Sequence, residues 1–289
     1  AVNSVLNVKH VIVGVEVEES KLLINELLRP FFRYENQYLF MPILDAEFTK
    51  LSISGMLATR VRYMNDLALV AEKLGIDILN VKQALGADTR IGSAYLSPGS
   101  GFGGENFSHD ILTLSSAVSK TGAKSRLLQQ VWEINETQKE ILFRKLWNYY
   151  HSNLKEKTIA IWGASFNENS SNVNNSPIHT ILAALWAQGA KVRLHDPQAL
   201  QEIYKIYGER EDLVLSHDPY EVVNDADAGV GIQHVQHHSN PRRSISAGSA
   251  SLLMLKSSLN PVQPCIKPAH ESGCGMITRL LPRQRINTS

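Results

Sequence analysis

Residues 157–197 read KTIAIWGASFNENSSNVNNSPIHTILAALWAQGAKVRLHDP, and this segment decides the fold class. An apolar run that ends in a glycine turn, at residues 157–166, is typical of a buried strand. Residues 176–190 have the apolar spacing of a helix, with Pro177 in its first turn. Residues 191–197 predict a second strand. Strand, helix and strand in this order indicate a parallel, doubly wound α/β sheet.

The sequence after this segment first continues the pattern and then loses it. Residues 213–232 suggest a strand, a helix and the start of a third strand. Residues 231–289 have no sustained period, and all their charged residues except Glu271 are basic. We predict that this tail is irregular, and its composition is similar to that of out-of-frame translation. Three histidines in it, at 234, 237 and 238, have no acidic or cysteine partner nearby, so we predict no metal site.

The sequence before this segment is mostly helical. Residues 45–75 have helical spacing over nearly thirty positions, with Asp45 as the expected N-cap and Gly75 as the C-terminal stop. We predict further helices at 77–85, 109–122 and 125–150. Near the N-terminus, a strand at 11–15, a helix ending before Pro30 and a short strand at 37–43 are expected.

Composition excludes several classes of protein. The 289 residues carry a formal net charge of +1, which gives no long-range field to attract nucleic acid or an anionic membrane. No apolar run approaches the roughly 20 residues of a membrane span. Both cysteines, Cys265 and Cys274, lie in the last 25 residues, so a disulfide framework is not expected. We therefore predict a cytoplasmic protein with neither nucleic acid nor membrane as a partner.

A glycine-rich loop, GSGFGGENFSHD at residues 99–110, interrupts the helical part. Four of its first six residues are glycine. Glycine lets a backbone approach a ligand closely or adopt a positive φ without steric cost. Two interpretations remain open from the residues alone, a tight turn between helices and a ligand-binding loop.

Four stretches in the same order, spanning about residues 8–230, resemble the UDP-glucose/GDP-mannose dehydrogenase family. Residues 45–75 are similar to its long central helix, of the form AE-x-TK-x-x-x-N-x-x-L-A-x-[KR]. Residues 86–111 are similar to its RIG…P-G-x-G-[FY]-GG-x-CF-x-KD signature, and residues 159–197 to the opening of its C-terminal domain. Residues 10–31 are similar to the segment that precedes the central helix.

The resemblance implies three domains: an N-terminal Rossmann domain for NAD, a helical dimerisation domain and a Rossmann-like domain for the UDP-sugar. We accordingly expect a remnant of the NAD domain at 1–44, the helical domain at 45–150, a partial UDP-sugar domain at 151–230 and the irregular tail at 231–289. Because most of the NAD domain is missing, we expect that this chain does not bind NAD. A homodimer through the central helix is expected.

The family reaction that the resemblance implies is oxidation of a sugar C6 alcohol to a carboxylate by two hydride transfers to NAD, as in the conversion of UDP-glucose to UDP-glucuronate. It proceeds through a thioester on a cysteine. Here the cysteine position is Asn106, which has no thiolate, and the family's asparagine on the central helix is Ser54. Lys50 and Asp110 match the family's lysine and aspartate. The candidate catalytic positions are therefore Lys50, Ser54, Asn106 and Asp110.

The resemblance also implies substrate-binding positions, which are Arg90, Tyr95, Leu96, Gly99, Gly101, Phe102, Gly103, Gly104, Phe166 and Asn167. Arg90 matches an arginine that reaches the substrate of the neighbouring subunit. Asn167 and Asn174 replace a lysine and an arginine, and each lost charge-assisted contact costs about 1.5–3 kcal/mol. We expect weak or lost UDP-sugar binding and a catalytically inactive chain. The alternatives are a non-catalytic dimerisation partner and a nucleotide-sugar binding module.

Overall fold

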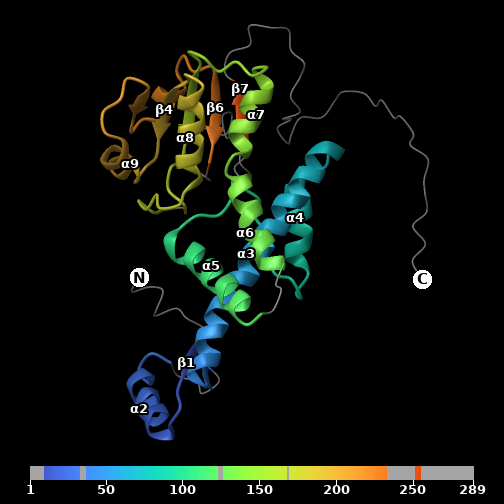
Figure 1. Cartoon of the computed structure of the whole chain (residues 1–289), viewed down its shortest axis with the longest axis vertical. Coiled ribbons are helices and arrows are strands. Elements are labelled where there is room, and N and C mark those ends of the chain that lie inside the picture. Colours follow the sequence, from blue (N-terminus) through green and yellow to red (C-terminus); the bar gives the residue numbers. More distant parts are fainter. Residues whose placement is uncertain (1–9, 33–36, 123–125, 168, 233–250, 255–289) are drawn as a thin grey trace, which may run out of the picture. The chain divides into compact units, whose positions relative to one another are not determined.

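The computed structural model describes residues 10–32, 37–122, 126–167, 169–232 and 251–254. A five-stranded sheet has the order β5-β4-β3-β6-β7 (Figure 1). Its first four strands are parallel, which confirms the predicted doubly wound sheet. The bounds of the strands are β3 Thr158–Trp162, β4 Lys191–His195, β5 Leu213–Leu215, β6 Ala228–Gly231 and β7 Ser251–Met254.

Helix α8, Pro177–Ala187, covers this sheet and forms because its N-terminal signals agree with its apolar face. Ser176 is the N-cap, and its hydroxyl accepts a hydrogen bond from the N–H of Ile178 at 3.3 Å. Pro177 occupies the first turn, where its missing N–H costs nothing. Two shorter helices complete this part of the chain, α9 Leu200–Tyr207 and α10 Pro219–Val223.

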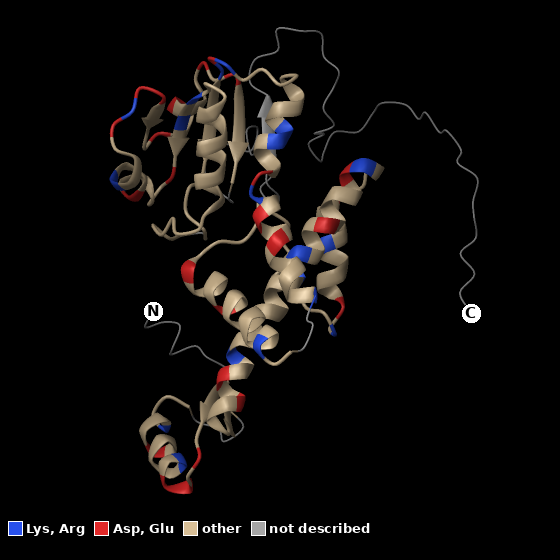
Figure 2. Cartoon of the chain, viewed as in Figure 1, with Lys and Arg blue, Asp and Glu red and all other residues tan. Residues whose placement is uncertain are grey.

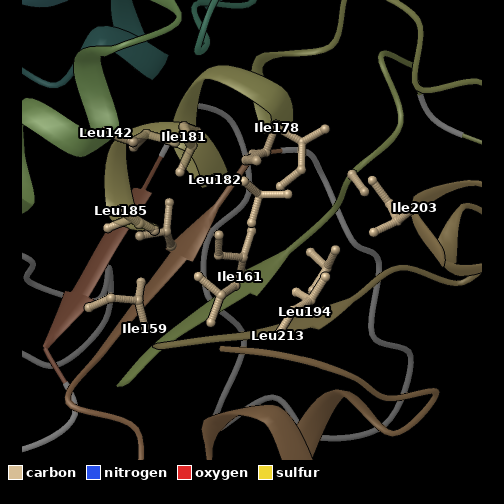
Figure 3. Close-up of a cluster of buried hydrophobic side chains, with 14 of the residues drawn as sticks. Leu142, Ile159, Ile161, Ile178, Ile181, Leu182, Leu185, Leu194, Ile203 and Leu213 are labelled. Atoms are coloured by element: carbon tan, nitrogen blue, oxygen red, sulfur yellow. The ribbon is translucent and has the colours of Figure 1, made fainter. Parts of the chain in front are cut away.

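The main hydrophobic core lies between α8 and the sheet. Figure 3 shows the apolar face of α8 packed on side chains that project from the strands. Each such aliphatic side chain stabilises the fold by about 1.5–3 kcal/mol when it leaves water completely. The fully buried members shown include Ile178, Ile181, Leu182 and Leu185 of α8 and Ile159, Ile161 and Leu194 of the strands.

Five helices form the middle of the chain: α3 Ile43–Leu74, α4 Ile78–Ala87, α5 Glu105–Lys120, α6 Arg126–Gln138 and α7 Ile141–Tyr149. The long helix α3 packs against α4, α5 and α6. A small apolar cluster lies between α3, α5 and α6, made by Ala58, Ile111 and Val131 with Phe102, Phe107 and Trp132 at its edge. Lys and Arg are interspersed with Asp and Glu along these elements (Figure 2).

Two predicted helix boundaries were wrong. Helix α3 begins at Ile43, with Pro42 at the N-cap position, so Asp45 is not the cap. The carboxylate of Asp45 lies instead in the first turn, where its negative charge interacts favourably with the positive end of the helix dipole. Helix α5 begins at Glu105 rather than 109. The earlier start was missed because Phe107 is the one apolar residue in 105–108, which is too little to establish a period. The predicted stop at Gly75 is confirmed, since this glycine has φ 68°.

The single long helix predicted at 125–150 was also wrong, because the structure has two helices with a break at Lys139 and Glu140. At the break the N–H of Glu140 donates to the carbonyl of Thr137, three residues earlier, as in a 3₁₀ turn and not four residues earlier as in an α-helix. Lys139 is only 2% exposed although it is charged. Its tertiary partners, which are described below, decide the course of the chain here, and sequence periodicity does not contain them.

The N-terminal part is a small βαβ unit. Strands β1 Val11–Gly14 and β2 Tyr38–Met41 are parallel, and α2 Glu18–Leu28 connects them. Gly14 lies against α3, where an added Cβ would be 2.9 Å from the Cα of Ile43. Among the described residues, no helix has the length and apolar character needed to cross a bilayer.

In the segment predicted to be irregular, only residues 231, 232 and 251–254 are described. Residues 251–254 form β7, which pairs antiparallel with β6 in the register Ala228↔Met254. No period in the sequence indicates this strand, because four residues are too few to establish alternation. Both cysteines and the histidines at 234, 237 and 238 lie outside the described residues.

Candidate functional site

Three of the predicted catalytic positions meet where α3 crosses α5. Lys50 and Ser54 are one turn apart on α3 and share a face, as the i, i+4 spacing requires. Both contact Asp110 of α5: Lys50 forms an ion pair with Oδ1, and the Ser54 hydroxyl donates to Oδ2 at 2.8 Å. The side chain of Asp110 is 7% exposed, whereas that of Lys50 is 65% exposed. A buried carboxylate therefore fixes an accessible ammonium group.

The balance of forces on Asp110 keeps it ionised. Burial acts to raise the pKa of this carboxyl group, because charge is less stable away from water. Hydrogen bonds from Lys50 and Ser54, with the positive charges of Lys50 and His109, outweigh burial and hold the pKa below its ordinary value. At neutral pH the cluster thus consists of an anion, a cation and a hydroxyl, which can stabilise negative charge on a ligand oxygen but includes no thiol.

The fourth predicted catalytic position, Asn106, lies in the first turn of α5 and is exposed. It precedes Asp110 by one helical turn, so both residues lie on the same face of α5. Its side-chain amide can donate or accept a hydrogen bond. It cannot form the covalent bond that a thiolate would form at this position.

The glycine-rich loop between α4 and α5 is anchored by three buried amide side chains that sequence analysis missed. Asn65 accepts a hydrogen bond from the N–H of Gly99 at 2.8 Å, and Gln138 donates to the carbonyl of Gly99 at 2.8 Å. Asn135 makes two bonds to the backbone of Phe102, at 2.8 and 3.0 Å. In the sequence these amides look like the other polar residues of α3 and α6, so they gave no separate signal.

The last two glycines of the loop allow a close approach of another segment of the same chain. A Cβ on Gly103 would be 2.6 Å from the carbonyl oxygen of Asn175, and one on Gly104 would be 2.8 Å from the ring of Phe166. Gly104 also has φ 86°, and its N–H donates to the carbonyl of Asn174 at 3.1 Å. The structure thus gives these glycines a third reason beside the two open interpretations, which is close packing against Phe166, Asn174 and Asn175.

The segment after β3 lies at the C-terminal edge of the parallel sheet. The chain leaves β3 towards β4 and β5 and later returns to β6 on its other side, so β3 and β6 flank a topological switch point. In open α/β sheets ligands bind at such points. The buried carboxylate of Asp196 fixes the segment by accepting bonds from the N–H groups of Ala164 and Ser165, at 2.7 and 3.3 Å. Of the predicted positions here, Phe166 is half-buried and Asn167 is exposed.

The remaining predicted binding residues occupy the turn that follows α4. The side chain of Arg90 is 86% exposed and pairs with Asp88, and this hydrogen bond holds the pKa of Asp88 below its ordinary value. Tyr95 has φ 57°, and its ring stacks on Phe107 with centroids 6.4 Å apart. Leu96 is buried. None of these contacts joins this turn to the Lys50, Ser54 and Asp110 cluster.

Comparison with known proteins matches two consecutive parts of the chain. Residues 44–137 match the UDP-glucose/GDP-mannose dehydrogenase family, central domain, and residues 160–241 match the UDP binding domain of the same family. Together the two matches cover more than half of the chain. The chain belongs to this family. The resemblance found from the sequence motifs is therefore confirmed.

Individual relatives agree with the family assignment. The chain is 30% identical over 278 residues to a UDP-glucose 6-dehydrogenase of Pseudomonas aeruginosa, a match over 95% of this chain and 60% of that protein. It is 31% identical to one of Bacillus subtilis, over 79% of this chain and 48% of that protein. A solved UDP-glucose dehydrogenase of Pyrobaculum islandicum shares the fold, with TM-score 0.73 and 24% identity over 78% of this chain and 50% of that one. The chain thus spans about half the length of these relatives.

The described residues do not fit the NAD site that the resemblance implies. Gly14, the last residue of β1, packs against α3 and so does not border a space for a phosphate. The glycines at 99, 101 and 104 have the spacing G-x-G-x-x-G, but they follow α4, whereas the dinucleotide fingerprint follows a strand. No group of three or more metal-ligating side chains occurs among the described residues either.

Proposed function

We propose that this chain binds a nucleoside diphosphate sugar and does not by itself oxidise it. Membership of the family supports binding of such a ligand, as does the cluster of the retained Lys50 and Asp110 with Ser54 in place of the family's asparagine. The observation that carries the second part is Asn106, which stands on the same face of α5 as Asp110. The family's covalent step needs a sulfur at that position, and the described residues do not form an NAD-binding site.

Each side chain of the cluster then has a binding role. The exposed ammonium of Lys50, fixed by Asp110, would neutralise negative charge on a ligand oxygen. Ser54 shares the carboxylate and keeps Asp110 ionised. The diphosphate would lie at the sheet edge near Phe166 and Asn167. Because Asn167 carries no charge, we expect the binding to be weak.

Titration calorimetry with UDP-glucose tests this proposal. We expect a dissociation constant near the millimolar range for the chain as it stands. Asn167→Lys should bind about tenfold more tightly or better, because one charge-assisted hydrogen bond contributes about 1.5–3 kcal/mol. Asn80→Lys is the matched control, since Asn80 is an exposed residue of α4 and its substitution adds the same charge elsewhere.

Two outcomes would contradict the proposal. Formation of NADH from UDP-glucose and NAD by the purified chain would refute the absence of oxidation. No heat with millimolar UDP-glucose, for both the unmodified chain and Asn167→Lys, would refute binding.

A second candidate function is self-association through α3. Met56, Tyr63 and Val70 are spaced seven residues apart, and their exposed fractions are 65%, 56% and 53%. Leu74 follows one turn later and is also exposed. Such a stripe, repeated every seven residues, is typical of a helix that packs against a second helix. We propose that a second copy of this chain covers it.

Sedimentation velocity distinguishes a dimer from a monomer. We expect the unmodified chain to be dimeric and Tyr63→Glu to weaken the dimer at least about tenfold, because a buried unpaired carboxylate is costly. Tyr204→Glu is the control, since Tyr204 is similarly exposed, at 55%, but lies on α9. A monomeric unmodified chain at high concentration would contradict this candidate.

A further inference from the structure

Lys139 is a buried cation that none of the functions above uses. It lies at the break between α6 and α7 and is 2% exposed. Its ammonium group contacts both carboxylate oxygens of Glu136, at 2.8 and 3.1 Å, and the side-chain oxygen of Asn175, at 2.7 Å. These contacts engage the three donors of a lysine. Removing a cation from water is costly, so its retention here requires a structural or functional reason.

Asn175 connects this cation to the candidate site. Its side-chain oxygen accepts from Lys139, and its side-chain amide donates to the hydroxyl of Ser108 on α5 at 2.6 Å. Its carbonyl oxygen lies against Gly103. It also has φ 54°, a left-handed conformation that asparagine adopts more readily than most residues. One residue thus contacts the α6–α7 break, α5 and the glycine-rich loop.

The stem of Lys139 reinforces this connection. A Cβ on Gly101 would lie 3.3 Å from the Cγ of Lys139, so the stem packs on the glycine-rich loop. Asn135, one turn before Lys139 on α6, bonds the next residue of the same loop, Phe102. The aliphatic stem of Lys139 thus packs on the glycine-rich loop, while its ammonium group binds Asn175 in the segment after β3.

We propose that Lys139 is a positioning residue for the nucleotide-sugar site. Through Asn175 it holds the described residues of the segment after β3, among them Phe166 and Asn174, against the glycine-rich loop and the first turns of α5. A ligand bound at the sheet edge is then held beside the Lys50, Ser54 and Asp110 cluster. The ligand-binding part of this inference rests on the proposed function, whereas the positioning part rests on contacts within the chain.

Hydrogen–deuterium exchange tests the positioning part without any ligand. In Lys139→Met we expect amide exchange in residues 99–110 and 164–176 to be at least about tenfold faster, because these segments lose their common hydrogen bonds. Exchange in β3 and β4, which Lys139 does not contact, should be unchanged. Lys145→Met is the matched control, since Lys145 forms an exposed ion pair with Glu72 of α3, and it should leave both segments unaffected.

Asn175→Gly keeps the proposal testable if Lys139→Met does not fold. Glycine accepts the positive φ of this position and removes both side-chain bonds, so it should accelerate exchange in the same two segments. Lys139→Arg retains the charge and should restore slow exchange. Exchange in Lys139→Met, or failing that in Asn175→Gly, equal to that of the unmodified chain would overturn the proposal.

Calorimetry with UDP-glucose tests the ligand part. Lys139→Met should weaken binding at least about tenfold, and Lys139→Arg should restore it to within about threefold. Unchanged affinity in Lys139→Met would overturn the ligand part, even if exchange is faster. If the unmodified chain binds no UDP-glucose, the proposed function fails, and the exchange measurement still decides whether Lys139 positions the segment.

Discussion

Gly103→Ala will lower the free energy of unfolding by about 3 kcal/mol, the upper part of the range for added volume in a packed site. The new methyl group would be 2.6 Å from the carbonyl oxygen of Asn175 and 3.0 Å from the Cβ of Phe166. The first contact is with backbone, which cannot rotate away as the end of a long side chain can. Phe166 and Asn175 must therefore move away from the loop, and the hydrogen bond from Gly104 to Asn174 will be lengthened or lost.

Gly99→Ala provides the matched control in the same loop. Apart from its two chain neighbours, the part of the chain that the structure describes has no atom within 4 Å of a Cβ added at Gly99, and its φ is not in the left-handed range. We expect a change of less than about 1 kcal/mol, with a small stabilisation because alanine restricts the unfolded chain. Denaturant titration of both variants measures the difference. Equal stabilities would show that residues 166–175 do not pack on Gly103.

Lys50→Met will alter how stability depends on pH. In the unmodified chain the pKa of Asp110 is lowered, so its contribution to stability is present above the unfolded pKa, near 3.8, and is lost as pH falls through the lowered folded value. Without Lys50, burial prevails and we expect the pKa of Asp110 to rise above 3.8. Asp110 in the folded chain then binds its proton more tightly than in the unfolded chain. The free energy of unfolding therefore decreases as pH rises from about 4 towards the raised pKa, opposite to the effect of Asp110 in the unmodified chain.

At neutral pH we expect Lys50→Met to lower the free energy of unfolding by about 1–2 kcal/mol. A buried carboxylate that loses a partner costs about 1–3 kcal/mol, and the exposure of Lys50 together with the remaining bond from Ser54 reduces this. Denaturant titrations at a series of pH values from 3 to 8 measure both effects. Lys145→Met removes an exposed ion pair and should retain the pH dependence of the unmodified chain. The same dependence in Lys50→Met would show that Lys50 does not control Asp110.

The parallel sheet could be predicted because its signals are local. The apolar run of β3, the serine and proline that begin α8 and the apolar run of β4 all lie within residues 157–197. The stop of α3 was equally local, since Gly75 supplies the left-handed residue that ends the helix. Of the candidate site, the pairing of Lys50 with Ser54 followed from helical spacing. Their common partner Asp110 was expected only from the family resemblance.

Features that depend on distant contacts could not be predicted. The break after α6 places Lys139 against Asn175, a residue 36 positions further along the chain. The amides that anchor the glycine-rich loop, Asn65, Asn135 and Gln138, resemble ordinary polar residues of a helix until the loop lies against them. The first residues of α5 carry no apolar period, so the start of the helix at Glu105 had no local signal.

The amino-acid sequence by itself determined the four parallel strands of the sheet and helix α8, the family to which the chain belongs and the absence of a thiol at Asn106. These are properties of residue order, and periodicity and composition express them directly. Only the tertiary structure decided that the glycines at 103 and 104 make room for residues 166–175 and that Asp110 is buried between Lys50 and Ser54. Hydrogen bonds and close contacts between segments tens of residues apart set these features, and they exist only once the chain has folded.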